Sequence, residues 1–444
     1  MHSFKLMRGR LSALYFLQFA VWGCYLTCLG QFLGRVGLGR DISWFYSAAG
    51  LVSLFMPALA GYLADRRFEP SRLLASFHFI AACFMLSAWS YVRSAQSVEF
   101  LPLFIIYVLF LCFFMPTIPL ANTLTFSILG SRGMNAAEAF PRIRFFGTVG
   151  FIAAMWFVNC AYLHDGTFGM TLSDANPMAR WRFQYTDMML FSSGIIGVIT
   201  SLFVLTFSVT GNQSRRKRYV APEDSFVSRW LGGFMLLKNR NLRIFLIFAI
   251  LGGVCLQITN GFATPFITHF SSQPEYAGSG AAANATMLFS LSQISEAACI
   301  LLIPFFLRRY GFRVVLTVSF LAWALRFALF GWGNPGDGLW MFVASMLVYG
   351  VAFDFFNIAG AIYMEQNAGA GYRGRAQGIL MMMSNGIGAT FGMVWAGAVV
   401  NAFCNWRQID GMRYFIGDWS AVWMIFGAYA LALAVAFPLL FRRN

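Results

Sequence analysis

Apolar stretches of about 20 residues recur along the whole of this 444-residue sequence. Hydrophobic residues make up 59% of the chain and charged residues only 11%, and the mean hydropathy is +0.65. A helix of about 20 apolar residues spans the core of a bilayer. The pattern therefore predicts an all-α membrane protein with twelve transmembrane helices, near residues 11–34, 44–64, 73–93, 100–125, 143–163, 188–210, 242–268, 285–306, 313–332, 339–364, 375–403 and 419–440.

The net charge of +15 is spread unevenly between the two sides of the predicted membrane. Of the 32 Lys and Arg residues, 23 fall in segments on the side of the N-terminus, seven fall in the opposite loops, and Arg144 and Arg326 lie inside spans. Loops that face the cytoplasm are enriched in Lys and Arg. We therefore expect a multi-pass protein of the cytoplasmic (inner) membrane with both termini cytoplasmic, and we interpret the positive charge as a topology signal and not as nucleic-acid binding.

Cysteine and histidine are too scattered to predict a metal site. None of the eight cysteines forms a CxxC pair, and the chain has only four His. No Ser/His/Asp set and no soluble catalytic domain favours an enzyme, so we expect no cofactor, no metal and no catalysis. The first apolar segment, Leu11 to Leu33, is too long for a signal peptide and is interpreted as the first span.

A short motif, Gly61-Tyr62-Leu63-Ala64-Asp65-Arg66, lies between the second and third predicted spans. It resembles the Gly-x-x-x-Asp-Arg signature that the major facilitator superfamily carries at this point. The resemblance implies a structural or gating role for Gly61, Asp65 and Arg66.

The basic stretch at 211–240 separates the twelve predicted spans into two sets of six. This division fits the major facilitator fold of two pseudo-symmetric six-helix halves, in which the substrate site lies near the midplane between the halves. We expect an N-terminal half at 1–210, a cytoplasmic linker at 211–240 and a C-terminal half at 241–444.

An acidic residue, Asp354, interrupts the apolar run of the tenth span. A charge at the centre of a membrane helix costs roughly 2.5–3.5 kcal/mol, so such residues face a polar cavity or another protein group. Asn357 shares the face of Asp354, three residues on, whereas Tyr349 and Phe353 share another face at a spacing of four. An aromatic stripe at helical spacing is usually core, but this one adjoins the acid.

Two neighbouring spans each carry a polar pair one helical turn apart. The seventh has Gln257 and Asn260, and the eighth has Gln293 and Glu296. A single buried amide more often joins helices than binds a ligand. Two such pairs together with an intramembrane Glu favour a shared binding cavity. The eleventh span, which is rich in Gly and Met, is interpreted as an adaptable packing surface.

Three further polar residues within spans have two interpretations each. Arg144, with Thr148 one turn on, either extends its head group to the interface or faces a cavity, where a planar guanidinium suits a hydroxylated or carbonyl-bearing ligand. Arg326 either pairs with a buried acid or takes part in coupling. Gln18, on one face with Trp22, either joins helices or lines the cavity.

Segments in seven of the twelve predicted spans resemble one family, the nucleoside:proton symporters of the major facilitator superfamily. These segments are Leu17-Gln18-Phe19, Trp22-Gly23, Met56-Pro57-Ala58-Leu59, Ile143-Arg144, Gly147-Thr148, Leu256-Gln257-Ile258-Thr259-Asn260, Ser292-Gln293-Ile294-Ser295-Glu296, Ile303-Pro304-Phe305-Phe306-Leu307, Leu325-Arg326-Phe327-Ala328-Leu329-Phe330 and Phe353-Asp354-Phe355-Phe356-Asn357. Two positions depart from the family pattern: Cys255 stands where an acid is expected, and Phe146 where a Trp is expected.

The resemblance implies nucleoside uptake coupled to inward proton flow, with Asp354 or Glu296 as the proton-coupling group. It implies that the substrate-binding residues are Arg144, Thr148, Gln257, Asn260, Gln293, Glu296, Tyr349, Phe353 and Asp354. The expected partners are the nucleoside, protons and the lipid bilayer, and we expect a monomer. The alternatives are a proton-coupled symporter of sugars or other small polyols and a nucleoside sensor that does not transport.

Overall fold

Helices account for most of the described chain, because in lipid a backbone has to satisfy its own hydrogen bonds. The computed structural model describes residues 2–66, 69–131, 136–173, 176–207, 238–276, 278–300, 302–367, 379–409 and 411–441. Within these residues, nine helical stretches are long and apolar enough to cross a membrane. Each of the twelve predicted spans coincides, over its described residues, with one helix or with two consecutive helices. Most of the predicted linker at 211–240 lies outside the described residues.

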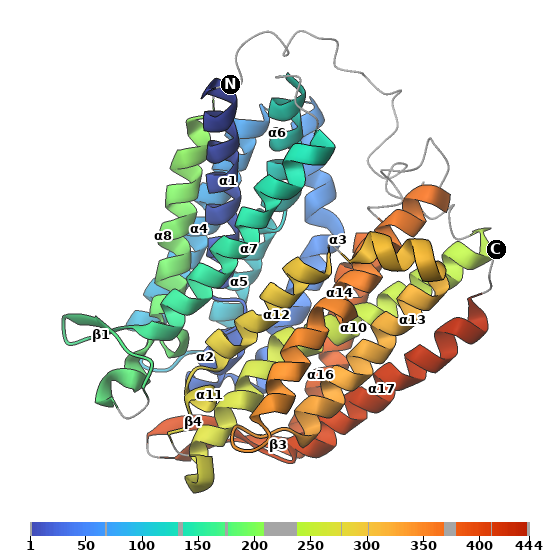
Figure 1. Cartoon of the computed structure of the whole chain (residues 1–444). Coiled ribbons are helices and arrows are strands. Elements are labelled where there is room, and N and C mark those ends of the chain that lie inside the picture. Colours follow the sequence, from blue (N-terminus) through green and yellow to red (C-terminus); the bar gives the residue numbers. More distant parts are fainter. Residues whose placement is uncertain are drawn as a thin grey trace. The chain divides into compact units, whose positions relative to one another are not determined.

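The chain forms two compact units, and each is described by itself. Unit 1 consists of Met1–Leu26, Val52–Val158 and Thr186–Trp230. Within it, α4 packs against α5, α6 and α8, and α1 packs against α8 (Figure 1). Its helices are α1 (His2–Gly23), the later part of α3 (Ile42–Arg66), α4 (Pro70–Ser94), α5 (Phe100–Phe114), α6 (Thr117–Ser131), α7 (Ala136–Cys160) and α8 (Met188–Leu205).

Unit 2 consists of Thr27–Leu51, Asn159–Tyr185 and Leu231–Asn444. Within it, α13 packs against α14 and α17, α12 packs against α14, and α10 packs against η7 and α16. Its main helices are α10 (Arg240–His269), α12 (Ala285–Cys299), α13 (Ile303–Trp332), α14 (Leu339–Asn367), the π-helix η7 (Met382–Gly388), α16 (Ala389–Phe403) and α17 (Trp419–Leu440). Its short helices are α2 (Leu29–Arg35), η1 (Gly39–Asp41), η2 (Pro177–Trp181), η3 (Phe183–Tyr185), η5 (Phe270–Ser272), η6 (Pro274–Tyr276) and α11 (Gly280–Ala283).

Unit 2 also contains two antiparallel β-hairpins, which the sequence pattern did not predict. Strands β1 (Ala161–His164) and β2 (Thr167–Met170) follow α7, and β3 (Cys404–Ile409) and β4 (Met412–Gly417) connect α16 to α17. In the second hairpin Trp406 pairs with Phe415, and their rings stack with centroids 4.7 Å apart. The second hairpin returns the chain within a short connection, so α17 starts beside α16, which it contacts.

The structure differs from the predicted spans at three places. The predicted spans 11–34 and 100–125 are each two helices, with turns after Gly23 and at Pro116. Glycine weakens a helix, and proline lacks the N–H that an uninterrupted helix requires. The predicted boundary between the eighth and ninth spans falls within α13 at Gly311, whose φ of 74° interrupts the helix. A residue with a side chain rarely adopts that left-handed conformation.

Candidate functional site

The acid at the centre of the tenth predicted span lies in the interior of unit 2. Asp354 on α14 is 2% exposed, and its Oδ2 atom has no hydrogen-bond partner among the described residues. The carboxyl group of Glu296, on α12, lies close enough to interact with it electrostatically. A buried acid with an unused oxygen is costly for a membrane helix, which makes Asp354 a candidate functional residue.

Close contact between two backbones brings α12 and α14 together at this level. A Cβ atom on Gly350 would lie 2.5 Å from the backbone oxygen of Ser295, so only glycine permits the approach. The Ser295 hydroxyl donates to the Leu347 carbonyl and accepts from the Gly350 N–H at 3.3 Å. This contact fixes α12, and with it Gln293 and Glu296, beside Tyr349 and Asp354.

The second intramembrane arginine is enclosed by aromatic rings. Arg326 on α13 is 0% exposed. Its guanidinium carbon lies 4.8 Å from the ring centroid of Tyr349 and 5.0 Å from that of Phe330. It donates to the Ser345 carbonyl and, at 3.4 Å, to the Ser292 hydroxyl. No carboxylate in the described part of the chain forms an ion pair with it, so the ion pair that the sequence left open is not observed.

Tyr349 links this arginine to the acids. Its ring stacks on Phe353 with centroids 5.5 Å apart and an interplanar angle of 8°. Its hydroxyl is within hydrogen-bonding reach of Gln293, and Glu296 and Asp354 act on it electrostatically. One side of α14 therefore presents an aromatic pair, and the acid stands beside that pair.

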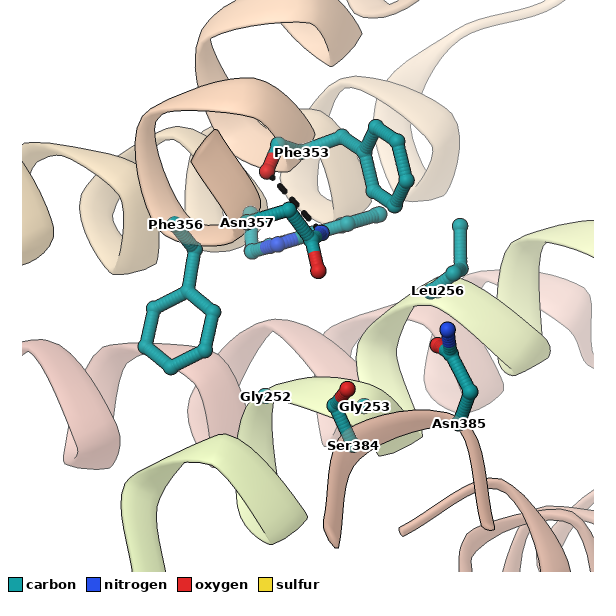
Figure 2. Close-up of a pocket in the computed structure, with 9 residues that line it drawn as sticks. Gly252, Gly253, Leu256, Phe353, Phe356, Asn357, Ser384 and Asn385 are labelled. Atoms are coloured by element: carbon teal, nitrogen blue, oxygen red, sulfur yellow. Dashed lines mark hydrogen bonds between the residues drawn. The ribbon is translucent and has the colours of Figure 1, made fainter. Parts of the chain in front are cut away.

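The polar pair of α10 lies on the same unit. Gln257 and Asn260 are half-buried, and the preceding residue of the helix, Leu256, lines a small cavity together with Phe353 (Figure 2). Unit 2 thus contains seven of the nine predicted substrate-binding residues.

The other two predicted substrate-binding residues belong to α7 in unit 1. The guanidinium carbon of Arg144 lies 3.9 Å from the ring centroid of Phe19 on α1. Thr148, one turn on, is half-buried. Stacking on an aromatic ring holds the planar guanidinium in a defined orientation. Of the predicted gating residues, Gly61, Asp65 and Arg66 belong to the backbone of α3, but their side chains lie outside the described part of the structure.

The chain as a whole matches proteins of known class. The pattern of the nucleoside H+ symporter family covers residues 6–444. The nucleoside permease NupG of Escherichia coli strain K12 is 37% identical over 440 residues, which is 98% of this chain and 96% of the permease. The xanthosine permease of the same organism is 34% identical over 439 residues, with the same coverage of both chains.

The solved structure of the nucleoside transporter NupG superposes with a TM-score of 0.81 at 36% identity, and the match covers 98% of this chain and 99% of that one.

The chain belongs to the nucleoside H+ symporter family. This membership confirms the predicted function of proton-coupled nucleoside uptake and makes the protein a transporter and not an enzyme. It also confirms the predicted fold class, an all-α membrane protein with the major facilitator fold, and the helices of the described residues are consistent with twelve spans. Nine apolar helices in the described residues agree with a multi-pass membrane protein.

Unit 1 of the symporter contains a buried cluster of hydrogen-bonded side chains, of which the sequence indicated only Gln18. Gln18 is 1% exposed; its Oε1 lies 2.5 Å from Nε2 of His78, and its Nε2 donates to Thr117 at 2.6 Å. A carboxamide oxygen only accepts hydrogen bonds, so Nε2 of His78 carries the proton. Gln18 therefore joins α1 to α4 and α6, the first of its two interpretations. A lone His within an apolar span was the signal that sequence reasoning passed over.

Two asparagines that line the cavity in the symporter were also missed as site residues. Asn357 was recognised only as sharing a face with Asp354, and Asn385 lies in the span interpreted as a packing surface. The π-helical turn of η7 places Asn385 at the cavity. Such turns are frequent at functional sites, but no residue pattern in the sequence marks where one forms.

Proposed function

We propose that this symporter carries nucleosides and protons together into the cytoplasm across the cytoplasmic (inner) membrane, by alternating access between halves at 1–210 and 241–444. Both termini and the linker at 211–240 lie in the cytoplasm, and the protein works as a monomer surrounded by lipid. The uneven distribution of Lys and Arg supports this orientation.

Asp354 and Glu296 form the proton site in this proposal. The observation that carries it is the buried Asp354 carboxylate, with an oxygen that has no partner among the described residues and with Glu296 as its electrostatic neighbour. Two acids that face each other in a low dielectric repel one another, and a single proton between them removes that repulsion. Arrival or departure of this proton changes the charge of the site, and this change couples proton flow to the cycle.

The nucleoside binds between the aromatic pair and the polar residues. One face of the Phe353 ring stacks on the base, and Tyr349 stacks on the other face of the Phe353 ring. The ribose hydroxyls donate to Glu296 and Asp354, while the amides of Gln257, Asn260 and Gln293 complete the hydrogen bonds. Arg144 and Thr148, presented by α7, contact the nucleoside in the loaded state.

Arg326 has a structural role in this scheme. It holds Tyr349 from the side opposite the substrate, because its guanidinium lies over the tyrosine ring and is bonded to α14 through Ser345. Gly61, Asp65 and Arg66 form the cytoplasmic hinge. Moving one charge through 100 mV releases about 2.3 kcal/mol, enough for roughly 50-fold accumulation of an uncharged nucleoside.

Uptake into proteoliposomes tests the proposal directly. Purified protein is reconstituted, an inward proton gradient is imposed, and accumulation of radiolabelled uridine, adenosine, inosine and xanthosine is followed with and without a protonophore. We expect accumulation that collapses when the protonophore is added and that unlabelled nucleosides, but not ribose or hexoses, inhibit.

The alternatives give different results in the same assay. Inhibition by free ribose or hexoses would indicate a sugar or polyol symporter, and binding without accumulation would indicate a sensor. Proton-driven uptake that survived both Asp354→Asn and Glu296→Gln would contradict the assignment of the proton site.

A further inference from the structure

A small cavity in unit 2 lies next to the proposed proton site, among α10, α13, α14 and η7 (Figure 2). Its empty volume is about 270 Å³, with the open space at its mouth included. Much of that volume is open space, so the enclosed part is far smaller than a pocket for a whole ligand and admits only the edge of a flat group. Three rings (Trp323, Phe353 and Phe356) and three polar side chains (Asn357, Ser384 and Asn385) line it.

The orientation of the first carboxamide in this cavity is fixed. Asn357 lies 3.1 Å from the backbone carbonyl of Phe353, one turn earlier on α14. A carbonyl only accepts hydrogen bonds, so the Asn357 atom that faces it is the nitrogen. Oδ1 of Asn357 is therefore turned away from its own helix, and Figure 2 shows it pointing toward the wall formed by α10 and η7. The cavity thus contains a hydrogen-bond acceptor at a set position.

The second carboxamide reaches the cavity because η7 lies directly on α10. A Cβ on Gly253 would collide with the backbone carbonyl of Ser384, and a Cβ on Gly388 with that of Ile250. The absence of both side chains lets the π-helical turn sit against α10, and Asn385, the residue after Ser384, then projects into the space beside Leu256 (Figure 2).

Unlike Asn357, Asn385 is free to turn. It is half-buried, and its side chain makes no hydrogen bond with another residue in the described part of the chain. A carboxamide that rotates by 180° exchanges its donor for its acceptor. The cavity therefore offers one fixed acceptor and one group that adapts to the ligand.

We propose that this cavity takes the hydrogen-bonding (Watson–Crick) edge of the nucleobase, with Oδ1 of Asn357 accepting a base N–H and Asn385 pairing with the neighbouring base atom. This inference rests on the proposed nucleoside uptake and adds two specificity-determining residues to it. Only this edge then enters the cavity, between α14 and η7, and the rest of the base and the ribose stay outside it, near Phe353 and Glu296.

The chemistry of the two amides defines what is recognised. Uracil presents a ring N–H at this edge, as do guanine, hypoxanthine and xanthine, and adenine and cytosine present an exocyclic amino group. Each base therefore satisfies the fixed acceptor of Asn357. An acceptor neighbours this donor in every one of these bases, and guanine also carries an amino donor on the other side. The carboxamide of Asn385 turns to match either. The pair selects a base edge with a donor and does not separate purines from pyrimidines.

Methylated nucleosides test the fixed acceptor in the unaltered protein. Uptake of radiolabelled uridine into proteoliposomes is inhibited with unlabelled uridine or with 3-methyluridine, which lacks the ring N–H. We expect 3-methyluridine to inhibit at least about tenfold more weakly, because a buried acceptor is left without its partner. Equal inhibition by the two compounds would overturn the inference without any variant having to fold.

Two variants separate the roles of the asparagines. In Asn357→Leu the preference for uridine over 3-methyluridine should fall below about threefold, because the acceptor is gone. In Asn385→Leu both compounds should inhibit about fivefold more weakly, with their ratio kept. Met381→Leu is the matched control, since Met381 lies just before η7 and is 60% exposed. It should behave as the unaltered protein.

The outcomes separate a failure of this inference from a failure of the proposed nucleoside uptake. If the unaltered protein accumulates none of the four labelled nucleosides, the proposed function fails. If it accumulates uridine but Asn357→Leu keeps the full preference over 3-methyluridine, only the assignment of the base edge fails. A thermal melt of each purified variant shows whether it has folded, and the competition in the unaltered protein remains decisive if one has not.

Discussion

In unit 1 the side chains of Gln18, His78 and Thr117 bind one another, whereas in unit 2 an oxygen of Asp354 and Nε of Arg326 have no hydrogen-bond partner among the described residues. In unit 1 the Thr117 hydroxyl also donates a hydrogen bond to the Phe114 carbonyl. Only one nitrogen of the His78 ring remains without a partner among the described residues. All of these side chains are buried and lie in predicted spans.

This difference in hydrogen bonding indicates different roles for the two sets of buried polar side chains. A polar cluster whose members satisfy one another has little bonding capacity left for a ligand, so it joins helices and stabilises the unit. A buried carboxylate with an unused oxygen is costly for the folded state, and a transporter tolerates that cost where a proton and a substrate arrive during the cycle. Burial alone therefore does not identify a binding residue, and Asp354 stands out because a buried acid, an unused oxygen and a second acid beside it occur together.

The largest effect that this comparison predicts follows from neutralising the acid of unit 2. In Asp354→Asn, proton-driven uridine accumulation should fall by roughly 50-fold, to simple equilibration, because the side chain no longer exchanges a proton. The melting temperature of the purified protein should stay the same or rise, since a buried charge has been removed. Asp337→Asn, which changes an exposed acid that precedes α14, is the control. A large loss of stability in Asp354→Asn would show that Asp354, like the polar cluster of unit 1, bonds to protein groups and stabilises the fold.

The hydrogen-bonded cluster of Gln18, His78 and Thr117 in unit 1 should respond in the opposite way. Gln18→Leu leaves Nε2 of His78 without a partner, whereas the Thr117 hydroxyl keeps its bond to the Phe114 carbonyl, and an unpaired buried group costs about 1–3 kcal/mol. The melting temperature should therefore fall, while the KM for uridine in the protein that remains folded stays within about twofold. A changed KM with unchanged stability would move Gln18 from the helix contact to the substrate site.

An amide of unit 2 provides the matched counterpart. Gln257 is half-buried on α10, and Gln257→Leu makes the same chemical change as Gln18→Leu. We expect the KM for uridine to rise about tenfold with little change in melting temperature, because the lost hydrogen bond is made to substrate and not to protein. If both variants lost stability to the same extent, the distinction between the two units would not hold.

The smallest effect concerns the hydroxyl of Tyr349. Tyr349→Phe keeps the ring beside Arg326 and the stack on Phe353, but removes the group within reach of Gln293. We expect uptake to fall only about threefold, whereas Tyr349→Ala should abolish it, because the ring that supports Phe353 is lost. Initial rates of uridine uptake, scaled to the amount of protein in the membrane, separate the two outcomes.

Hydropathy and helical spacing predicted most of the fold and grouped most of the candidate site. The run around Asp354 was expected to point polar groups at the acid, and Glu296 and Tyr349 do lie beside it. These predictions succeed because the period of a helix and the cost of burying a charge act locally along the chain. The two β-hairpins were missed, since short connections between spans carry no comparable periodic signal.

By itself, the sequence determined that the chain crosses a membrane many times, and its buried polar residues and their spacing determined which helix faces carry chemistry. Only the tertiary structure decided that Gln18 is bonded to His78, that Arg326 is enclosed by rings and has no acid partner among the described residues, and that Asn385 reaches the cavity. Each of these depends on how closely two distant segments approach. That approach depends on single glycines such as Gly253 and Gly350 and on the π-helical turn, and hydropathy does not register either of them.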